Sequence, residues 1–189
     1  MTTGTDPQRM LAEMRFEDAI AELRARPGAL DHTNAEGLIR EWELQARQLQ
    51  ARGETGAARR MARGVRALRA LLAHGPDPER MVAEVELPEG YQGKIVLVLF
   101  KGGGFDGRVC LRSGDGWHRE ILNNAMTELR DLGFPSAEAY PLGGAYAGFD
   151  DDGRIVIWGT SDEFGSCDKD LAAEMIRRAY PDQRVVIED

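Results

Sequence analysis

Cysteine, histidine and lysine are all scarce in this sequence of 189 residues. The two cysteines, Cys110 and Cys167, exclude a disulfide framework, and neither has the spacing of a zinc ligand. We therefore expect reduced structural thiols. We also expect no metal or other cofactor. No segment approaches the roughly 18 consecutive apolar residues of a membrane-spanning helix, and the residues after Met1 lack the basic and apolar regions of a signal peptide. These absences predict a cytoplasmic protein with no membrane partner.

Basic residues are fewer than acidic ones. Lys and Arg together number 24 against 32 Asp and Glu, which gives a formal net charge of -8 and a pI near 5.0. An acidic protein is a poor general ligand for nucleic acid, so we expect no nucleic-acid partner. Residues 1–85 contain 13 acidic and 13 basic side chains, whereas residues 86–189 contain 19 and 11. The whole negative charge therefore belongs to the second part of the chain.

A change of composition near residues 75–82 divides the chain in the same place. Pro76-Asp-Pro78 closes a region rich in Ala, Arg, Leu and Glu, and β-branched runs separated by glycine-rich turns follow it. Hydrophobic residues make up 42% of the sequence, which suffices for a buried core. We therefore predict two domains, a helical unit over residues 1–80 and an α/β domain over residues 82–189.

The helical unit is predicted to contain three helices. The first covers about Pro7–Arg26, the second starts at a cap formed by Thr33 or Asn34, and the third follows Gly53–Thr55 and ends at His74–Pro76. A three-helix unit of this size buries one seam internally and often a second seam against a neighbour. We expect it to dock a partner protein or to form a homodimer. Apolar residues at helical spacing define the predicted buried face: Met10, Met14, Ile20, Leu23, Leu38, Trp42, Leu49, Ala58, Met61, Val65, Leu68 and Leu72.

The second domain shows the periodicity of strands. Two helices are predicted among the strands, over residues 116–132 and 168–179, with Gly133 and Tyr180-Pro181 as stop signals. This order predicts an α/β (α+β) fold in which a mixed β-sheet is sandwiched by two helices and preceded by the three-helix unit. The predicted strands are Val82–Leu87, Lys94–Phe100, Ala137–Tyr140, Arg154–Trp158 and Arg184–Ile187.

Among the three histidines, His118 is the candidate for chemistry. His32 falls in a turn before a helix, and His74 falls in the last helical turn, where a cation is mildly stabilising. His118 opens a helix directly after the loop Ser113–Trp117, so its ring would stand beside the N–H groups of a helix N-terminus. Such a terminus is a natural anion site. A plain cap or surface role is the alternative for this histidine.

Three glycine-rich segments fall in the same domain, at Lys101–Gly104, Leu142–Gly144 and Gly159–Gly165. None fits a Walker loop or a dinucleotide-binding fingerprint, because the required lysine and helix register are absent. Gly102–Gly104 is either a plain loop or a lip over a pocket. Gly159–Gly165 joins a buried strand to a helix, which is where α/β sheets place ligand-binding loops.

Several motifs of the second domain occur in a recognisable order. They are Val85-Glu-Leu-Pro-Glu-Gly-Tyr-Gln-Gly-Lys94, Trp117-His118 before a long helix, a Leu142-Gly-Gly144 turn, Gly159-Thr-Ser161 with Phe164-Gly165, and Tyr180-Pro181 before the last strand. With this order and spacing, residues 82–189 resemble the Janus/Ocnus family of protein phosphohistidine phosphatases, whereas the helical unit lies outside the resemblance. The resemblance implies a domain that removes phosphate from histidine and, in some members, lysine side chains without a metal.

The resemblance also implies roles for residues of this chain. His118 would be the catalytic histidine, acting as a general base on water or as a transient phosphoryl acceptor. Lys94 would hold the phosphate as a point charge. The implied substrate is a phosphorylated protein or a small phosphoramidate. The remaining contacts to it would come from Trp117, Gly159, Ser161 and the backbone N–H groups of Arg119 and Glu163.

The sequence departs from the family pattern at two places. Tyr146 stands where the family has an arginine directly after its glycine turn, so a bidentate phosphate donor is missing. The phosphate loop carries Asp162 and Glu163, which would repel a phosphate if both were ionised and close to it. The two carboxylates either point outward into solvent or select a cationic context such as a lysine or arginine side chain. Three arginines are candidates to compensate for them: Arg108, Arg112 and Arg119.

Other functions remain open for the same scaffold. One is a non-catalytic binding or regulatory module, in which the helical unit mediates partner binding or self-association. Another is an enzyme of different chemistry, in which Asp162 or Glu163 acts as acid or base beside His118. A nucleophilic Cys167 is disfavoured, because no histidine is near it in sequence and neighbouring carboxylates oppose thiolate formation at the helix start.

Overall fold

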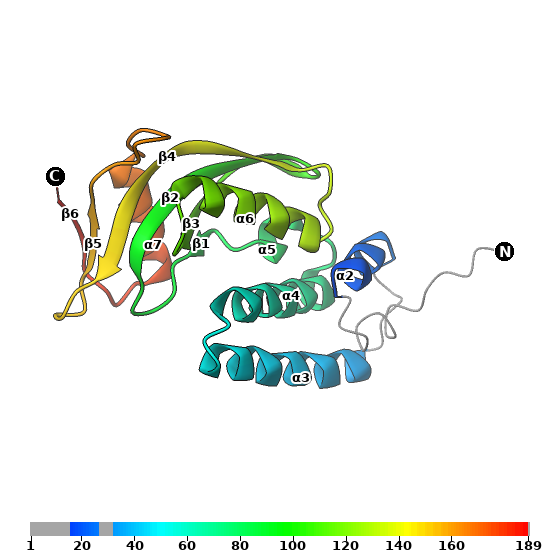
Figure 1. Cartoon of the computed structure of the whole chain (residues 1–189). Helices are drawn as coiled ribbons and strands as arrows, with labels where there is room; N and C mark the ends of the chain where they lie inside the picture. The colour runs from blue at the N-terminus through cyan, green and yellow to red at the C-terminus, as the bar shows by residue number, and fades with distance from the viewer. Residues whose placement is uncertain (1–15, 27–31, 189) are drawn as a thin grey trace. The chain divides into compact units, whose positions relative to one another are not determined.

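The computed structural model describes residues 16–26 and 32–188 of the chain. They fall into two compact units, one made of Met1–Val82 with Glu128–Ser136, the other of Ala83–Thr127 with Ala137–Asp189. Figure 1 shows the helices of the first unit and the sheet of the second. Within the described residues, no helix combines the length and the apolar character that a membrane span requires.

The helical unit consists of α2 Phe16–Ala25, α3 His32–Ala51, α4 Thr55–His74 and the short α5 Pro78–Met81. Met10 and Met14, with the first part of the predicted helix, lie outside the described residues. The predicted core residues that the structure buries are Ile20, Leu23, Trp42, Ala58, Met61, Val65 and Leu68. Three other predicted core residues, Leu38, Leu49 and Leu72, are only half-buried, and Ile39 and Leu71 are buried beside two of them.

Two helix starts differ from the sequence prediction. His32, Thr33 and Asn34 all lie in the first turn of α3, so the predicted turn at His32 and the predicted cap are wrong. The N–H groups of a first turn need no intrahelical partner, so cap-forming residues also fit inside it. At the other place, Asp77 caps α5 through a hydrogen bond from the Glu79 N–H to its carboxylate (3.0 Å), and Pro78 fills the first helical position. The predicted strand from Val82 is therefore reduced to β1, Val85–Glu86.

The end of helix α6, His118–Asp131, belongs to the helical unit although its start belongs to the sheet unit. Arg60 Nε lies 2.9 Å from Asp131 Oδ2, and the guanidinium of Arg24 lies 3.6 Å from the ring centre of Phe134. Gly133 ends α6 with a φ of 79°, as its predicted stop role requires. The helical unit therefore includes a segment from the second half of the chain.

The sheet is mixed and six-stranded, with the order β1-β3-β2-β4-β5-β6. The β1–β3 and β5–β6 pairs are parallel and the other pairs are antiparallel, which confirms the predicted fold class. The remaining strands are β2 Gln92–Gly102, β3 Phe105–Gly114, β4 Glu138–Phe149, β5 Ile155–Trp158 and β6 Val185–Ile187.

Two of these strands were not expected from the sequence in this form. Strand β3 was missed, and Gly102–Gly104 forms the end of β2 and the turn into β3, at the opposite end of β2 from Lys94. Strand β4 continues through Leu142–Gly144, which the sequence predicts as a turn. A register shift against β2, between Val96 and Val98, accommodates the irregular backbone there. Glycine in this segment therefore marks a close approach within a strand, as the site shows.

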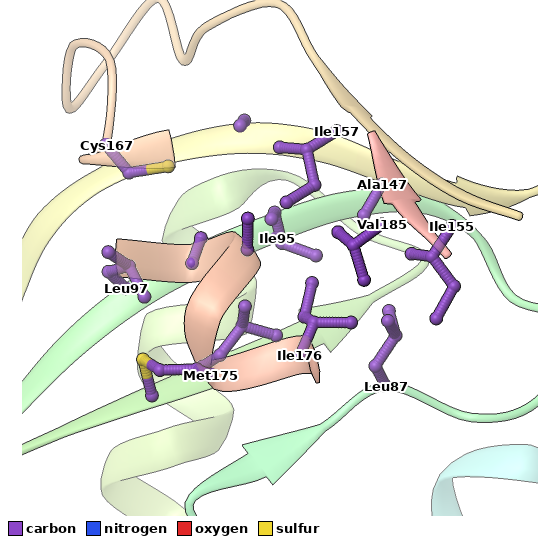
Figure 2. Close-up of a cluster of buried hydrophobic side chains, with 14 of the residues drawn as sticks. Leu87, Ile95, Leu97, Ala147, Ile155, Ile157, Cys167, Met175, Ile176 and Val185 are labelled. Atoms are coloured by element: carbon purple, nitrogen blue, oxygen red, sulfur yellow. The ribbon is translucent and has the colours of Figure 1, made fainter. Parts of the chain in front are cut away.

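Helices cover both faces of the sheet. Helix α7, Lys169–Ala179, packs on one face, where Figure 2 shows Ile95, Leu97, Ile157 and Ile176 meeting in an aliphatic core. Helix α6 packs on the opposite face, because a Cβ placed on Gly114 of β3 would lie 2.9 Å from Cγ1 of Ile121. Successive residues of a strand point to opposite faces, so each strand contributes alternately to the two layers.

Candidate active site

His118 is held at the start of α6 by its own turn. Glu120 reaches back to accept a hydrogen bond from the Trp117 N–H (3.0 Å), and the Trp117 carbonyl accepts from the N–H groups of Glu120 and Ile121. This contact is one half of a capping box, in which the acidic residue of the first turn satisfies the N–H before the helix. It fixes the direction in which the helix leaves the loop and buries His118, whose residue is 5% exposed.

The imidazole of His118 has a defined tautomer in this setting. Its Nε2 lies 3.2 Å from the carbonyl oxygen of Ala145 on β4. A carbonyl oxygen accepts hydrogen bonds and cannot donate them, so in the neutral imidazole Nε2 carries the proton and Nδ1 carries the lone pair. The bond orients the ring as a carbonyl or carboxylate orients many catalytic histidines.

Gly144 makes this approach of strand and ring feasible. A Cβ at Gly144 would lie 2.6 Å from Cδ2 of His118 and 2.9 Å from Cβ of Ser161. Any side chain would therefore displace the imidazole or the loop that carries Ser161. The glycine provides space for the site, and its strand conformation shows that a turn is not what requires it.

Lys94 comes from β2, directly opposite Tyr146 on β4. Its Nζ lies 4.9 Å from the ring centre of Trp117 and 5.9 Å from that of Tyr146. Two predicted site residues, Lys94 and Trp117, are therefore neighbours, and both lie beside His118. The electron-rich faces of these two rings attract the ammonium group and help to hold it in place.

The loop Gly159–Gly165 is closed by Ser161. The residue is buried, its N–H donates to the Gly144 carbonyl (3.1 Å), and its Oγ accepts from the N–H groups of Phe164 (3.1 Å) and Glu163 (3.3 Å). The structure thus brings Ser161 against the same glycine as His118. The Glu163 N–H, which the sequence places on the phosphate, instead points to the Ser161 hydroxyl. We call Lys94, Trp117, His118, Tyr146 and Ser161 the His118 site.

One of the two loop carboxylates is neutralised by an arginine. Glu163 forms an ion pair with Arg119 of α6, and both side chains lie at the surface. Asp162 is exposed. Arg112 is buried on β3, donates to the Leu111 carbonyl (2.9 Å) and lies 4.0 Å from Glu86, so it does not offset the loop charge. Arg108 lies opposite Phe100, towards the other end of β2 from Lys94.

Tyr146 forms an aromatic wall that the sequence did not predict. Its ring centre lies 5.8 Å from that of His118, edge to face, and 5.9 Å from that of Trp158, nearly parallel. Gly159, expected to bind phosphate, leaves room for this wall, because a Cβ there would lie 3.1 Å from Cδ2 of Tyr146. Trp158 was missed as a site residue, since only the register of β4 and β5 places it opposite Tyr146.

The cysteines lie in the interior. Cys110 and Cys167 are both buried and unpaired by disulfide, and Cys167 forms part of the core in Figure 2. Burial raises the pKa of the Cys167 thiol, which disfavours the thiolate that a nucleophile requires. This supports the predicted structural role. Within the described ranges, no group of three or more His, Cys, Asp or Glu residues could hold a metal ion.

Comparison with models of known protein families shows to which family the chain belongs. The family model of the Janus/Ocnus family (Ocnus) matches residues 80–184. This is more than half of the chain and includes the whole His118 site, so the chain belongs to the Janus/Ocnus family, as its sequence motifs indicate. No curated protein matches the chain.

Proposed function

We propose that this protein is a phosphohistidine or phospholysine phosphatase-like hydrolase that cleaves N-linked phosphate. The observation that carries the proposal is the bond between His118 Nε2 and the Ala145 carbonyl, which leaves the lone pair on Nδ1. A buried imidazole with one nitrogen fixed and the other basic can accept a proton or a phosphoryl group. Membership of the Janus/Ocnus family supports the same chemistry.

Two routes are compatible with this geometry. In the direct route, Nδ1 takes a proton from water, the water oxygen bonds to phosphorus, the P–N bond breaks, and the imidazolium returns the proton to the leaving nitrogen. In the covalent route, Nδ1 bonds to phosphorus while the P–N bond breaks and solvent protonates the leaving nitrogen. Water then displaces the phosphoryl group from His118. Both routes need the same tautomer.

Neutralisation of the phosphate would fall on two groups. Lys94 supplies a full positive charge beside Trp117, and the start of α6 supplies the N–H groups of His118 and Arg119. Tyr146 adds no charge. Because Glu163 is paired with Arg119, the repulsion expected from the acidic loop is reduced to that of the exposed Asp162. We propose that this loop favours phosphate on a cationic side chain such as lysine or arginine.

The test is hydrolysis of phosphohistidine and phospholysine peptides in EDTA, which removes divalent metal. We expect turnover by the wild-type protein and a loss of at least about a hundredfold in His118→Ala. His74→Ala is the matched control, because His74 lies in the last turn of α4 in the helical unit, and it should retain wild-type turnover. The proposal is abandoned if the wild-type protein leaves both peptides intact and also fails to bind inorganic phosphate.

A second candidate function is partner binding through the helical unit, on the same chain. Its support is a hollow of about 520 Å³ on α3 and α4, lined by Glu43, Ala46, Arg47, Ala62, Val65, Arg66 and Arg69. We propose that this surface mediates docking or self-association. The exposed Ala62 offers a mild probe, because Ala62→Glu places a charge in the hollow without touching the core. Light scattering over a range of concentrations should show association that this variant weakens; a monomer at every concentration contradicts self-association.

A further inference from the structure

A second hollow lies on the sheet unit, beside the His118 site. It has a volume of about 330 Å³ and is lined by Gln92, Gly148, Phe149, Asp150, Val156, Trp158 and Glu188. We call it the Trp158 hollow. Gln92 pairs with Gly148, and Gly148 pairs with Val156, two residues along the strands from the row Lys94, Tyr146 and Trp158. A step of two residues returns to the same sheet face, so the hollow and the His118 site share that face.

The shape of the hollow depends on two of its lining residues, Gly148 and Trp158. A Cβ at Gly148 would lie 2.9 Å from Cγ of Gln92 and 3.4 Å from Cη2 of Trp158. The missing side chain therefore leaves the space between the two larger residues open. The indole of Trp158 is only partly buried, so part of its surface is available to a ligand.

The charge of the hollow is negative. Asp150 is already engaged, because it accepts from Arg154 Nε (2.7 Å) and from the N–H groups of Asp152 and Arg154. Burial raises the pKa of Asp150, but the hydrogen bonds from Arg154 outweigh this and the net shift is downward. The exposed side chain of Glu188 takes part in no hydrogen bond or ion pair within the described part of the chain, although its charge contributes, after those of Asp150 and Asp152, to the raised pKa of Arg154. Glu188 is thus the carboxylate that a ligand can use.

The hollow is connected to the catalytic histidine by aromatic rings. Tyr146 lies between them, with its ring centre 5.9 Å from that of Trp158 and 5.8 Å from that of His118. An extended peptide advances about 3.3 Å per residue and repeats its side-chain direction every second residue. A side chain two to four positions away from a residue held at His118 therefore reaches the hollow.

We propose that the Trp158 hollow binds a basic side chain, preferably arginine, of a peptide substrate. This basic residue lies close in sequence to the phosphorylated residue. The planar guanidinium stacks on the face of Trp158, and its N–H groups donate to Glu188. This inference rests on the proposed phosphatase function for its substrate, but the binding of the basic residue is separate from the chemistry at His118. It assigns the protein to substrates whose phosphorylated residue lies in a basic sequence.

The first arm of the test uses peptides with a central phosphohistidine and either arginine or glutamate at one position, two to four residues away on either side. We expect arginine at one of these positions to raise kcat/KM by about five- to tenfold over glutamate, through KM. In Glu188→Gln, the ratio of kcat/KM for the arginine peptide to kcat/KM for the glutamate peptide should fall below about twofold. Because the net charge of -8 favours any basic peptide, Glu174→Gln, an exposed carboxylate on α7, is the matched control and should keep the ratio.

The second arm measures binding without turnover. Dye-labelled peptides with unmodified histidine, carrying arginine or glutamate at the same positions, are titrated with wild-type protein and Glu188→Gln, and anisotropy is recorded. Tighter binding of the arginine peptide that Glu188→Gln removes supports the hollow even if no peptide is hydrolysed, in which case only the phosphatase proposal fails. Equal binding of both peptides, or an arginine preference that survives Glu188→Gln, overturns the inference whatever the turnover.

Discussion

The two faces of the sheet are built for different tasks although the same strands supply both. On the α7 face, Ile95 and Leu97 of β2 meet Ile157 and Ile176 in a largely aliphatic layer. On the α6 face, Lys94 of the same strand stands among polar and aromatic groups. Because side chains alternate along a strand, adjacent residues such as Lys94 and Ile95 point to opposite faces, one into the candidate site and the other into the core. Substitutions on the two faces should therefore have different effects.

The largest expected effect is on the stability of the α7 face. Ile176→Ala removes a fully buried side chain, and we expect a loss of about 2–5 kcal/mol in the free energy of unfolding, measured in urea by tryptophan fluorescence. The folded fraction should keep its kcat on phosphohistidine peptides. Glu174→Ala, on the exposed face of α7, should cost less than about 0.5 kcal/mol. If Ile176→Ala instead lowers kcat in fully folded protein, the two faces are not independent.

A smaller change tests the α6 face. Gly144→Ala places a methyl group against His118 and Ser161, and we expect kcat/KM to fall by about a hundredfold, because a displacement of about 1 Å suffices for such a loss. The matched control is Gly56→Ala in α4, where an added Cβ would point into open space, and it should keep wild-type turnover. Unchanged turnover in Gly144→Ala, with a retained fold, contradicts the placement of the imidazole.

The smallest effect concerns pH and the α7 face. The pKa of Cys167 is raised by burial, so the folded protein retains the thiol proton at pH values where the unfolded chain loses it. The stability contributed by the neutral thiol is fully present below the pKa of Cys167 in the unfolded chain. It declines as the pH rises through the pKa of Cys167 in the folded protein. We expect the difference in unfolding free energy between wild type and Cys167→Ala to narrow between pH 7 and pH values above about 9. A difference that widens over this range contradicts the direction of the shift.

The sequence predicts the parts of the fold whose pattern is local. The apolar run of β2 is recognisable because its middle residues are buried on both faces, and α6 is recognisable from its spacing and its glycine stop. Strand β3 was missed because Arg108 and Arg112 interrupt its apolar pattern. Arg112 is buried all the same, since the Leu111 carbonyl and Glu86 provide partners for its guanidinium. Such partners are known only once the strands are paired.

The candidate site was predictable to a similar extent. His118, Lys94, Trp117 and Ser161 follow from helix, strand and loop motifs, and the structure places them together. The aromatic wall was not predictable, because Tyr146 and Trp158 become neighbours only through the register of β4 and β5. The role of Gly144 was misread for a related reason. In a sequence, a glycine required for space looks the same as one required for a turn.

The shared helix α6 has a consequence for the order in which the protein assembles during synthesis. The ribosome makes α2, α3 and α4 first, yet Arg60 and Arg63 face carboxylates at Asp131 and Glu128, which are made only after β1, β2 and β3. At roughly 5–20 residues per second, the helices wait several seconds for these partners. The N-terminal unit is thus the first to emerge, but it is completed only after half of the sheet has left the ribosome.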